Sequence, residues 1–387
     1  MSTGASSPLR FLQVIEASLG GTRRYLEDVF GALGGGPSNG LIYSLHRADS
    51  SFIALLQKLR AAGWMLFEVD MRRSIDPVND AKSAMAVHQI YRSFKPEVVH
   101  AHSSKAGAIA RLATIGMRQR PGIVYTPNSI GVNLGWIFHP IERLLALRLD
   151  VLAAVTRSER EELRALKLVP PSRIHVVHPT IDPHVFAPHD RIEARRALCL
   201  PDGPLIVAVG RVTAQKDPLT FVDFVAELQR RVADVRAIWV GDGELRQEMT
   251  ERIASLNLQD AISITGWLDD VRTHIAACDL FVSTSSYESF GYVTAEALAM
   301  DRAVVASAIT GTVDVVATDV DQQLYAYRDV SAAAILAERF LTDQRGAAEV
   351  ARRGRAHVLS TFSVASTRRS LEIAYEAALE HVRWRRA

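Results

Sequence analysis

The chain has 387 residues, which is enough for two domains of ordinary size. Hydrophobic residues make up 48% and charged residues 23%, as in an ordinary globular protein, and the formal net charge of +2 gives no indication of nucleic-acid binding. The two cysteines, Cys199 and Cys278, form neither a disulfide framework nor a metal-binding pair, and a reducing compartment fits this usage.

Residues 1–8 are polar and lack the apolar core of a signal peptide. A bilayer span needs about 20 apolar residues, and the apolar stretch 136–155 is interrupted by Glu142, Arg143, Arg148 and Asp150. We therefore expect a cytoplasmic protein, with a peripheral position on the inner face of the cell membrane as an alternative.

Short apolar runs alternate with amphipathic stretches, which is typical of parallel sheets covered by helices on both faces. In the first half, helical patterns fall at 22–33, 79–94 and 104–117, between most of the strands. The predicted strands are residues 12–17, 40–44, 98–102, 123–126, 151–155 and 174–177.

A proline-rich stretch at 177–183 predicts a domain boundary, after which the alternation restarts. The predicted strands there are 205–209, 237–240, 263–265, 280–283 and 303–306, with a helix at 218–228 and a purely helical region after Ser331. We predict an α/β protein of two doubly wound, Rossmann-like domains facing a central cleft. They comprise residues 1–183 and 184–387, and the last helical segment is able to pack back on the first domain. Ligands of such sheets bind outside the carboxyl ends of the strands.

The most informative segment, 285–298, reads as the end of a strand, a tight loop and a helix. Gly291 stands where the helix begins, where free backbone amides form an anion site. Glu288 precedes the helix, and Glu296 follows Gly291 by about 7.5 Å along the axis. A nucleotide-sugar would match this layout with its sugar, diphosphate and ribose. Two solvated glutamates on a surface helix would explain the same spacing.

Two cations, Arg211 and Lys216, flank a short loop after the predicted strand 205–209. Together they suit a diphosphate, because arginine binds it in a fork and lysine as a point charge. Near the start of the chain, Gly20 and Gly21 join a strand end to a helix and allow close approach of phosphate or sugar. Solvated loop cations and a plain tight turn are the structural alternatives.

Two short motifs suggest metal binding. His100 and His102 alternate on a strand and so face the same side, but no third ligand is evident nearby, which favours structural or substrate-facing histidines. Asp319 and Asp321 form a D-x-D pair within a polar stretch, where a solvated turn fits better.

Two further motifs have structural interpretations. Gly241 and Gly243 begin like a dinucleotide fingerprint, but Arg246 replaces the third glycine, so we reject NAD or FAD binding. Residues 103–105 follow a strand and can cap the next helix, which leaves Lys105 available for a polar contact.

Together, in order and over nearly the whole chain, these segments resemble family four of the retaining GT-B-fold glycosyltransferases. The matching segments are Gly20-Gly21, residues 96–102, 124–127, 210–217 and 240–243, and the pair Glu288 and Glu296. Residues 12–21 and 103–107 look most like members that build exopolysaccharides or surface glycans.

The resemblance implies that Arg211 and Lys216 hold the donor diphosphate and stabilise the leaving charge. Glu288 would contact hydroxyls of the donor sugar, and Glu296 would hold the ribose. Donor contacts are also implied for the backbone of Phe290, Gly291, Tyr292 and Val293, with Gly20 and Gly21 closing from the other domain. The family uses no divalent metal, so we expect no metal and no cofactor.

Asn128 stands where many members carry a histidine after the Thr-Pro pair. It can hydrogen-bond a sugar hydroxyl but cannot carry charge. Asn128, His102 and Lys105 are therefore candidate sugar or acceptor contacts.

We thus expect a retaining, metal-independent hexosyltransferase that moves a sugar from a nucleoside-diphosphate-sugar to a growing, lipid-linked surface glycan or exopolysaccharide. A transferase to a small soluble acceptor and an inactive nucleotide- or glycan-binding partner are the alternatives. Intact Arg211, Lys216, Glu288 and Glu296 argue against the inactive partner. No nucleic-acid partner is expected. Peripheral membrane contact would involve Arg23, Arg24 and residues 383–386, which solvated helix charges explain equally well.

Overall fold

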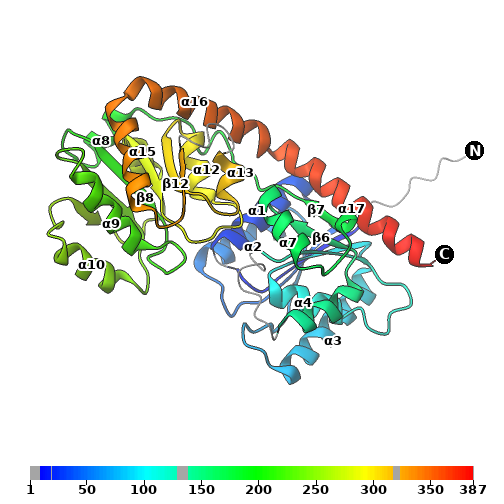
Figure 1. Ribbon diagram of the computed structural model, residues 1–387. Coiled ribbons are helices and arrows are strands. Elements are labelled where there is room, and N and C mark those ends of the chain that lie inside the picture. The colour runs from blue at the N-terminus through cyan, green and yellow to red at the C-terminus, as the bar shows by residue number, and fades with distance from the viewer. Residues whose placement is uncertain (1–8, 19, 129–137, 317–322, 387) are drawn as a thin grey trace, which may run out of the picture. The chain divides into compact units, whose positions relative to one another are not determined.

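The computed structural model describes residues 9–18, 20–128, 138–316 and 323–386 (Figure 1). The chain forms two compact units. The first contains Met1–Thr180 and Val364–Ala387, and the second contains Ile181–Ser363. The last helix, α17 (Val364–Arg386), is therefore counted with the first unit although it follows the second in sequence.

The first unit contains a seven-stranded sheet in the order β3-β2-β1-β4-β5-β6-β7, and its neighbouring strands are parallel. The strands are β1 (Phe11–Ile15), β2 (Asn39–Tyr43), β3 (Met65–Glu68), β4 (Val98–His102), β5 (Gly122–Thr126), β6 (Val151–Ala154) and β7 (Ile174–Val176). The helices are α1 (Gly20–Leu33), α2 (Ser50–Ala61), α3 (Pro77–Phe94), α4 (Ser104–Leu112), α6 (Phe138–Leu145) and α7 (Arg157–Ala165), with 3-10 turns η1 (Ala146–Arg148) and η2 (Pro171–Arg173).

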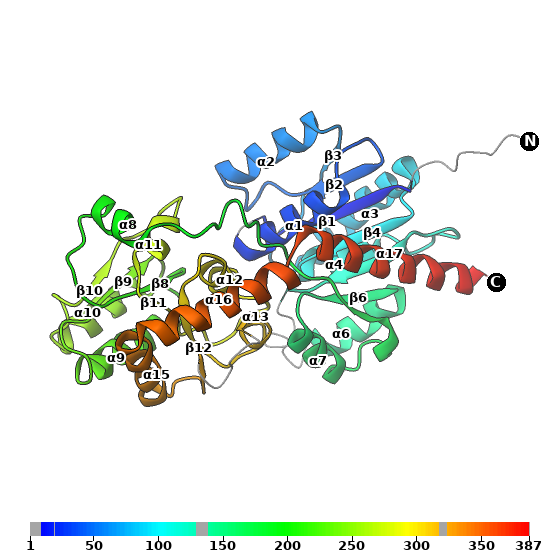
Figure 2. The same ribbon diagram turned by 90° about the horizontal axis from the view of Figure 1, so that it is seen from above.

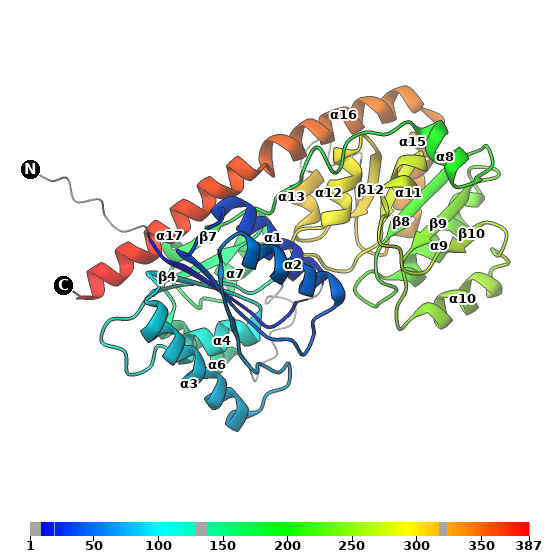
Figure 3. The same ribbon diagram turned by 180° about the vertical axis from the view of Figure 1, so that it is seen from behind.

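Successive residues of these strands point to opposite faces, which gives the first unit a core on each side of its sheet. Leu12, Val14 and Ile42 pack in one cluster with residues of α3 and α4. Ile15 and Leu41 pack in the other with residues of α1 and α2. Figure 3 shows α3 and α4 on one side of the strands and α1 and α17 on the other.

Helix α17 packs on the sheet through one apolar stripe. Leu371, Ala374, Tyr375, Ala378 and Val382 are all buried, and their spacing puts them on one face of a helix. A Cβ added at Gly122 of β5 would lie 3.1 Å from the Cβ of Ala378. Because glycine has no Cβ, α17 can approach the strand closely at this point.

The second unit contains a six-stranded parallel sheet in the order β10-β9-β8-β11-β12-β13. The strands are β8 (Leu205–Val209), β9 (Arg236–Val240), β10 (Ile262–Ile264), β11 (Leu280–Ser283), β12 (Ala303–Ser307) and β13 (Leu324–Tyr325). The helices are α8 (Arg191–Ala197), α9 (Pro218–Gln229), α10 (Arg246–Ser255), α11 (Arg272–Ala277), α12 (Tyr292–Ala299), α13 (Thr312–Val316), α15 (Val330–Thr342) and α16 (Gln344–Thr361).

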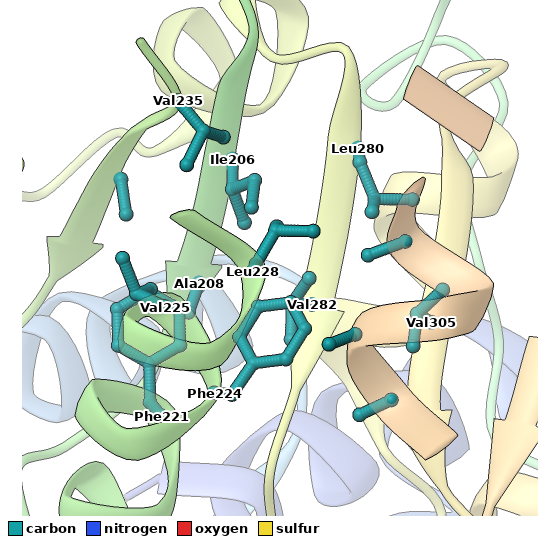
Figure 4. Close-up of a cluster of buried hydrophobic side chains, with 14 of the residues drawn as sticks. Ile206, Ala208, Phe221, Phe224, Val225, Leu228, Val235, Leu280, Val282 and Val305 are labelled. Carbon is teal, nitrogen blue, oxygen red and sulfur yellow. The ribbon is translucent and has the colours of Figure 1, made fainter. Parts of the chain in front are cut away.

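The core of the second unit lies between β8, β9, β11 and the helices α9 and α15. Phe221, Phe224 and Leu228 of α9 point toward Ile206 and Val282 of the sheet (Figure 4). Helix α16 lies beside α12 and α13 (Figure 2). The prediction of two doubly wound parallel α/β domains is confirmed.

Two strands and one helix end differ from the predictions. The edge strand β3 was missed because its residues are at most half-buried and show no alternation, and β13 has only two residues. Helix α4 ends at Leu112, before the predicted residue 117, and Gly116 adopts φ +80° in the turn that follows. No helix among the described residues is long and apolar enough to cross a membrane.

Candidate functional site

In the second unit, the loops that follow β8 and β11 are joined to each other by hydrogen bonds. The Thr284 hydroxyl donates to the backbone carbonyls of Lys216 (3.0 Å) and Asp217 (3.1 Å). The Ser286 amide donates to the carbonyl of Gln215 at 2.8 Å. Because β8 and β11 are neighbours, these bonds hold the loop with Arg211 and Lys216 against the loop with Glu288.

Lys216 and Glu288 form an ion pair at the carboxyl edge of this sheet. Their side chains are only 18% and 12% exposed. Glu288 also accepts a hydrogen bond from the Ser285 hydroxyl at 3.0 Å. An ammonium group has three N–H donors, so Lys216 can hold Glu288 and still bind a second anion.

Arg211 is the exposed cation of this group. Its guanidinium makes no hydrogen bond or ion pair with the other described residues, and it follows β8 directly. The structure therefore brings Arg211, Lys216 and Glu288 to one edge of the sheet, with the planar donor fork of Arg211 available to a ligand.

Asp217 anchors the loop behind Lys216. Its carboxylate accepts hydrogen bonds from Tyr327 (2.6 Å), Thr220 (2.9 Å) and Arg328 (3.1 Å), and it caps the start of α9. Burial alone would raise the pKa of Asp217, but these hydrogen bonds together lower it below its ordinary value. The carboxylate is therefore ionised at neutral pH and holds the backbone of this loop in place.

Helix α12 begins at Tyr292, with Gly291 as its N-cap residue at φ +94°. A residue with a side chain would be strained in this left-handed conformation. The helix therefore begins within the segment 285–298, at the position predicted from the sequence. The backbone amides of its first turn have no partners within the helix. The Thr312 hydroxyl lies near Gly291, is buried, and has no hydrogen-bond partner among the described residues.

The remaining predicted donor residues surround this helix start. Phe290 is buried and packs its ring 4.9 Å from that of Tyr292, whereas Tyr292 and Val293 are half-buried. Glu296 lies in the second turn of α12 and is only 3% exposed.

The motif at Gly241 and Gly243 has a packing role. A Cβ added at Gly241 would lie 2.1 Å from the carbonyl oxygen of Gly210. A Cβ added at Gly243 would lie 2.4 Å from the carbonyl oxygen of Val212. The Val212 amide donates to the Asp242 carbonyl at 2.9 Å. The two glycines thus let the end of β9 lie directly against the loop that carries Arg211.

Trp267 is an exposed residue at the same edge that the sequence analysis missed. It follows Gly266 at the end of β10 and is 71% exposed. In the sheet order β10-β9-β8, it lies two strands, or about 10 Å, from the end of β8. A tryptophan just after the predicted strand 263–265 was the sequence signal that could have identified it.

In the first unit, three neighbouring strands bring predicted residues to the carboxyl edge. Gly20 and Gly21 are exposed at the start of α1, which follows β1, and Gly20 has φ +62°. Asn128 follows β5 and is half-buried at φ +52°.

His102, from the strand between them, is fully buried with His100. Its Nε2 lies 2.9 Å from the Gln13 side-chain oxygen, while His100 bonds Tyr375 and Thr126. Burial lowers the pKa of His102 to about 3, so the ring is neutral at pH 7. His102 therefore packs beneath α1 and α17, while its Nδ1 has no hydrogen-bond partner among the described residues, and its contact with a sugar or acceptor stays a prediction.

Lys105 also has a structural partner. Its Nζ lies 2.6 Å from an Asp80 carboxylate oxygen and 2.8 Å from the Ser74 carbonyl oxygen. Asp319 and Asp321 lie outside the described residues. No group of three or more His, Cys, Asp or Glu side chains that could hold a metal occurs in the described ranges.

Three of the proposed membrane-contact residues can be placed relative to the sheet of the first unit. Arg23 and Arg24 lie in the first turn of α1, after the carboxyl end of β1, and Arg23 pairs with Asp49 at 3.0 Å. Arg383 lines a cavity with residues that precede β4 and β5. Arg383 therefore lies at the opposite edge of the sheet from Arg23 and Arg24.

Both units match family models. Residues 203–343 match the model described as "Glycosyl transferases group 1", and residues 20–180 match a "Glycosyl transferase 4-like domain". Together the matches cover most of the chain, which therefore belongs to the group 1, family-four-like glycosyltransferases of the GT-B fold.

Curated relatives are similar over part of their length. The chain is 27% identical to the Escherichia coli UDP-Gal:alpha-D-GlcNAc-diphosphoundecaprenol alpha-1,3-galactosyltransferase, over 67% of this chain and 70% of that protein. It is 30% identical to the alpha-D-kanosaminyltransferase of Streptomyces kanamyceticus over 44% of this chain and 45% of that protein. It is 32% identical to the D-inositol 3-phosphate glycosyltransferase of Mycobacterium marinum over 59% of this chain and 50% of that protein. Two of these three alignments span only about half of the relative.

Solved structures share the fold over nearly the whole chain. Anabaena HepE, in complex with UDP and glucose, superposes with a TM-score of 0.79 at 20% identity, covering 94% of this chain and 98% of that chain. A glycosyltransferase from Rickettsia africae gives a TM-score of 0.80 at 22% identity, covering 96% and 99%.

Proposed function

We propose that this protein is a retaining glycosyltransferase that transfers a sugar from a nucleoside-diphosphate-sugar to a glycan acceptor carried on a lipid. The observation that carries the proposal is the pair of joined loops after β8 and β11, which puts Arg211, Lys216 and Glu288 beside the start of α12. Two neighbouring cations and free helix amides suit a diphosphate, and a carboxylate suits sugar hydroxyls.

In this mechanism Arg211 and Lys216 bind the diphosphate and stabilise the negative charge that develops as the sugar leaves. Glu288 binds hydroxyls of the donor sugar, while its pairing with Lys216 fixes both side chains. Glu296 is assigned to the ribose. The backbone of residues 290–293 is assigned to the sugar and phosphate, and Gly20, Gly21 and Asn128 stay proposed ligand contacts of the first unit.

The acceptor class rests on similarity alone. The relative from E. coli is named for a diphosphoundecaprenol-linked acceptor, which supports a lipid-linked glycan. The relative from M. marinum is named for an inositol phosphate, which supports a small soluble acceptor as the second candidate. Radiolabel transfer into lipid-extractable or water-soluble product separates the two.

The donor can be identified by thermal unfolding in the presence of UDP-, GDP- and ADP-sugars. A donor at 100 times its Kd should stabilise the protein by about 2.7 kcal/mol. The anomeric configuration of the product, read by NMR, then tests retention. An inverted product would contradict the retaining mechanism, and no stabilisation by any nucleotide-sugar would contradict the donor site.

Turnover is expected to survive removal of divalent metal, because Arg211 and Lys216 supply the charge that a metal would otherwise provide at the diphosphate. The measurement is the initial rate before and after dialysis against EDTA. Loss of turnover in EDTA with recovery in Mg²⁺ or Mn²⁺ would show that catalysis depends on a metal.

Replacing Trp267 by alanine is expected to raise the KM for the donor, because we assign its exposed ring to stacking on the nucleobase. Base–aromatic stacking contributes about 1–3 kcal/mol, or roughly 5- to 150-fold. Trp267→Phe should retain most of this effect. Trp384→Ala serves as the control, because Trp384 belongs to the other unit and its exposed fraction is similar, 75% against 71% for Trp267. An unchanged KM in Trp267→Ala would exclude the stacking role.

A further inference from the structure

A cavity of about 790 Å³ lies in the first unit, away from Gly20 and Asn128 of the same unit. Its walls come from the end of α3, the segment before β5, and α17. The end of α3 precedes β4 and the segment 116–121 precedes β5, so the cavity is at the amino edge of the sheet. The five-residue strands β4 and β5 separate it by about 16 Å from the carboxyl edge with Gly20 and Asn128.

The cavity walls are strongly basic. The five lining cations are Arg92, Lys95, Arg118, Arg120 and Arg383. Arg120 is paired with Asp150 at 2.6 Å. The other four side chains are exposed and make no ion pair or hydrogen bond with the rest of the described chain.

The lining contains one carboxylate, Glu97, which accepts a hydrogen bond from the Arg10 amide at 2.6 Å. Counting Glu97 as −1 and the Arg120–Asp150 pair as neutral, the four unpaired cations leave the cavity at +3, whereas the whole chain carries +2. The cavity lining thus carries a clear excess of positive charge.

Helix electrostatics account for only part of this arrangement. Arg92 and Lys95 lie at the end of α3, where the helix dipole favours cations by about 0.3–1 kcal/mol each. Arg118 and Arg383 come from other elements and turn toward the same cavity. Like charges brought together without partners repel one another, and a bound anion would relieve that repulsion.

We infer that this cavity binds a phosphate-bearing anion at a site separate from the donor site. Arginine forks match the oxygens of phosphate, and the cavity has the volume of a typical small-molecule site, about 300–1,000 Å³. The anion is either a free phosphate compound or the headgroup of an anionic lipid, since the two present the same chemistry. The inference does not depend on the identity of the sugar donor.

The test uses the full-length chain with Arg211→Ala and Lys216→Ala, so that the proposed donor site cannot bind the probe. The first arm measures binding of radiolabelled inorganic pyrophosphate by equilibrium dialysis. The second arm measures flotation with phosphatidylglycerol–phosphatidylcholine vesicles against pure phosphatidylcholine vesicles at low salt. Both arms are repeated with the further changes Arg92→Gln, Arg118→Gln and Arg383→Gln.

A matched control removes three exposed cations from the second unit, through Arg230→Gln, Arg345→Gln and Arg352→Gln. We expect saturable pyrophosphate binding, or selective flotation with anionic vesicles, that falls at least tenfold in the cavity variant and is retained in the control. Pyrophosphate binding alone identifies a free phosphate compound, and flotation alone identifies a lipid headgroup. Absence of both, or equal loss in the control, overturns the inference.

Discussion

Replacing Lys216 by alanine is expected to lower kcat/KM for the sugar donor by roughly 10- to 100-fold or more. The proposed charge-assisted hydrogen bond to the diphosphate is worth about 1.5–3 kcal/mol. The change also removes the partner of Glu288, whose side chain is only 12% exposed. The effect should therefore appear both as weaker donor binding and as a slower chemical step. Steady-state kinetics at several donor concentrations measure the two separately.

Arg230→Ala is the matched control for Lys216→Ala. Arg230 lies in the same unit and is 77% exposed, so its loss changes the net charge equally without touching the joined loops. Thermal unfolding of both variants separates a loss of folding from a loss of function. A folded Lys216→Ala protein with activity within twofold of the parent would rule out the assigned role.

Replacing Arg111 by alanine is expected to cause a large loss of folding stability. Arg111 is fully buried and forms two hydrogen bonds to Glu142, at 2.8 and 3.0 Å, while its guanidinium lies 4.5 Å from the centre of the Tyr125 ring. Its removal would leave the Glu142 carboxylate buried without a cation. Breaking a buried ion pair from one side costs about 3–5 kcal/mol. Urea unfolding followed by circular dichroism measures the change.

The double variant Arg111→Met with Glu142→Leu tests the physical reason. Replacing a whole buried pair by apolar residues of similar volume is often neutral or stabilising. The double variant should therefore be more stable than Arg111→Ala. If the double variant loses as much stability as Arg111→Ala, the loss comes from the packing of the Arg111 side chain and not from an unpaired Glu142 carboxylate.

Most of the architecture could be predicted from the sequence, because strands buried on both faces and amphipathic helices have recognisable periods. The alternation of apolar runs identified eleven of the thirteen strands among the described residues, and the restart after the prolines at 177–183 separated two parallel sheets. The missed strands, β3 and β13, lie at sheet edges, where fewer residues need to be apolar. The sequence also predicted that a helix begins at Gly291, because a helix start depends on neighbouring residues.

Contacts between distant residues were decided by the tertiary structure. Lys216 and Glu288 are 72 positions apart, and no local pattern shows that their loops are joined by Thr284 and Ser286. The same applies to Asp217 and Tyr327, whose hydrogen bond crosses 110 positions. The sequence could identify these side chains as chemically suitable, but only the order of the strands brings them to one edge.

Tertiary packing also decided which candidate side chains have partners within the protein. His102 and Lys105 have the chemistry of a sugar site, yet one is buried against Gln13 and the other is paired with Asp80. Conversely, Arg118 and Arg383 look like solvated charges in the sequence, and the fold brings them to one cavity. Sequence determines which groups are present and which local element carries each one. Burial and the partners available across the fold decide whether a group is satisfied within the protein or left to bind a ligand.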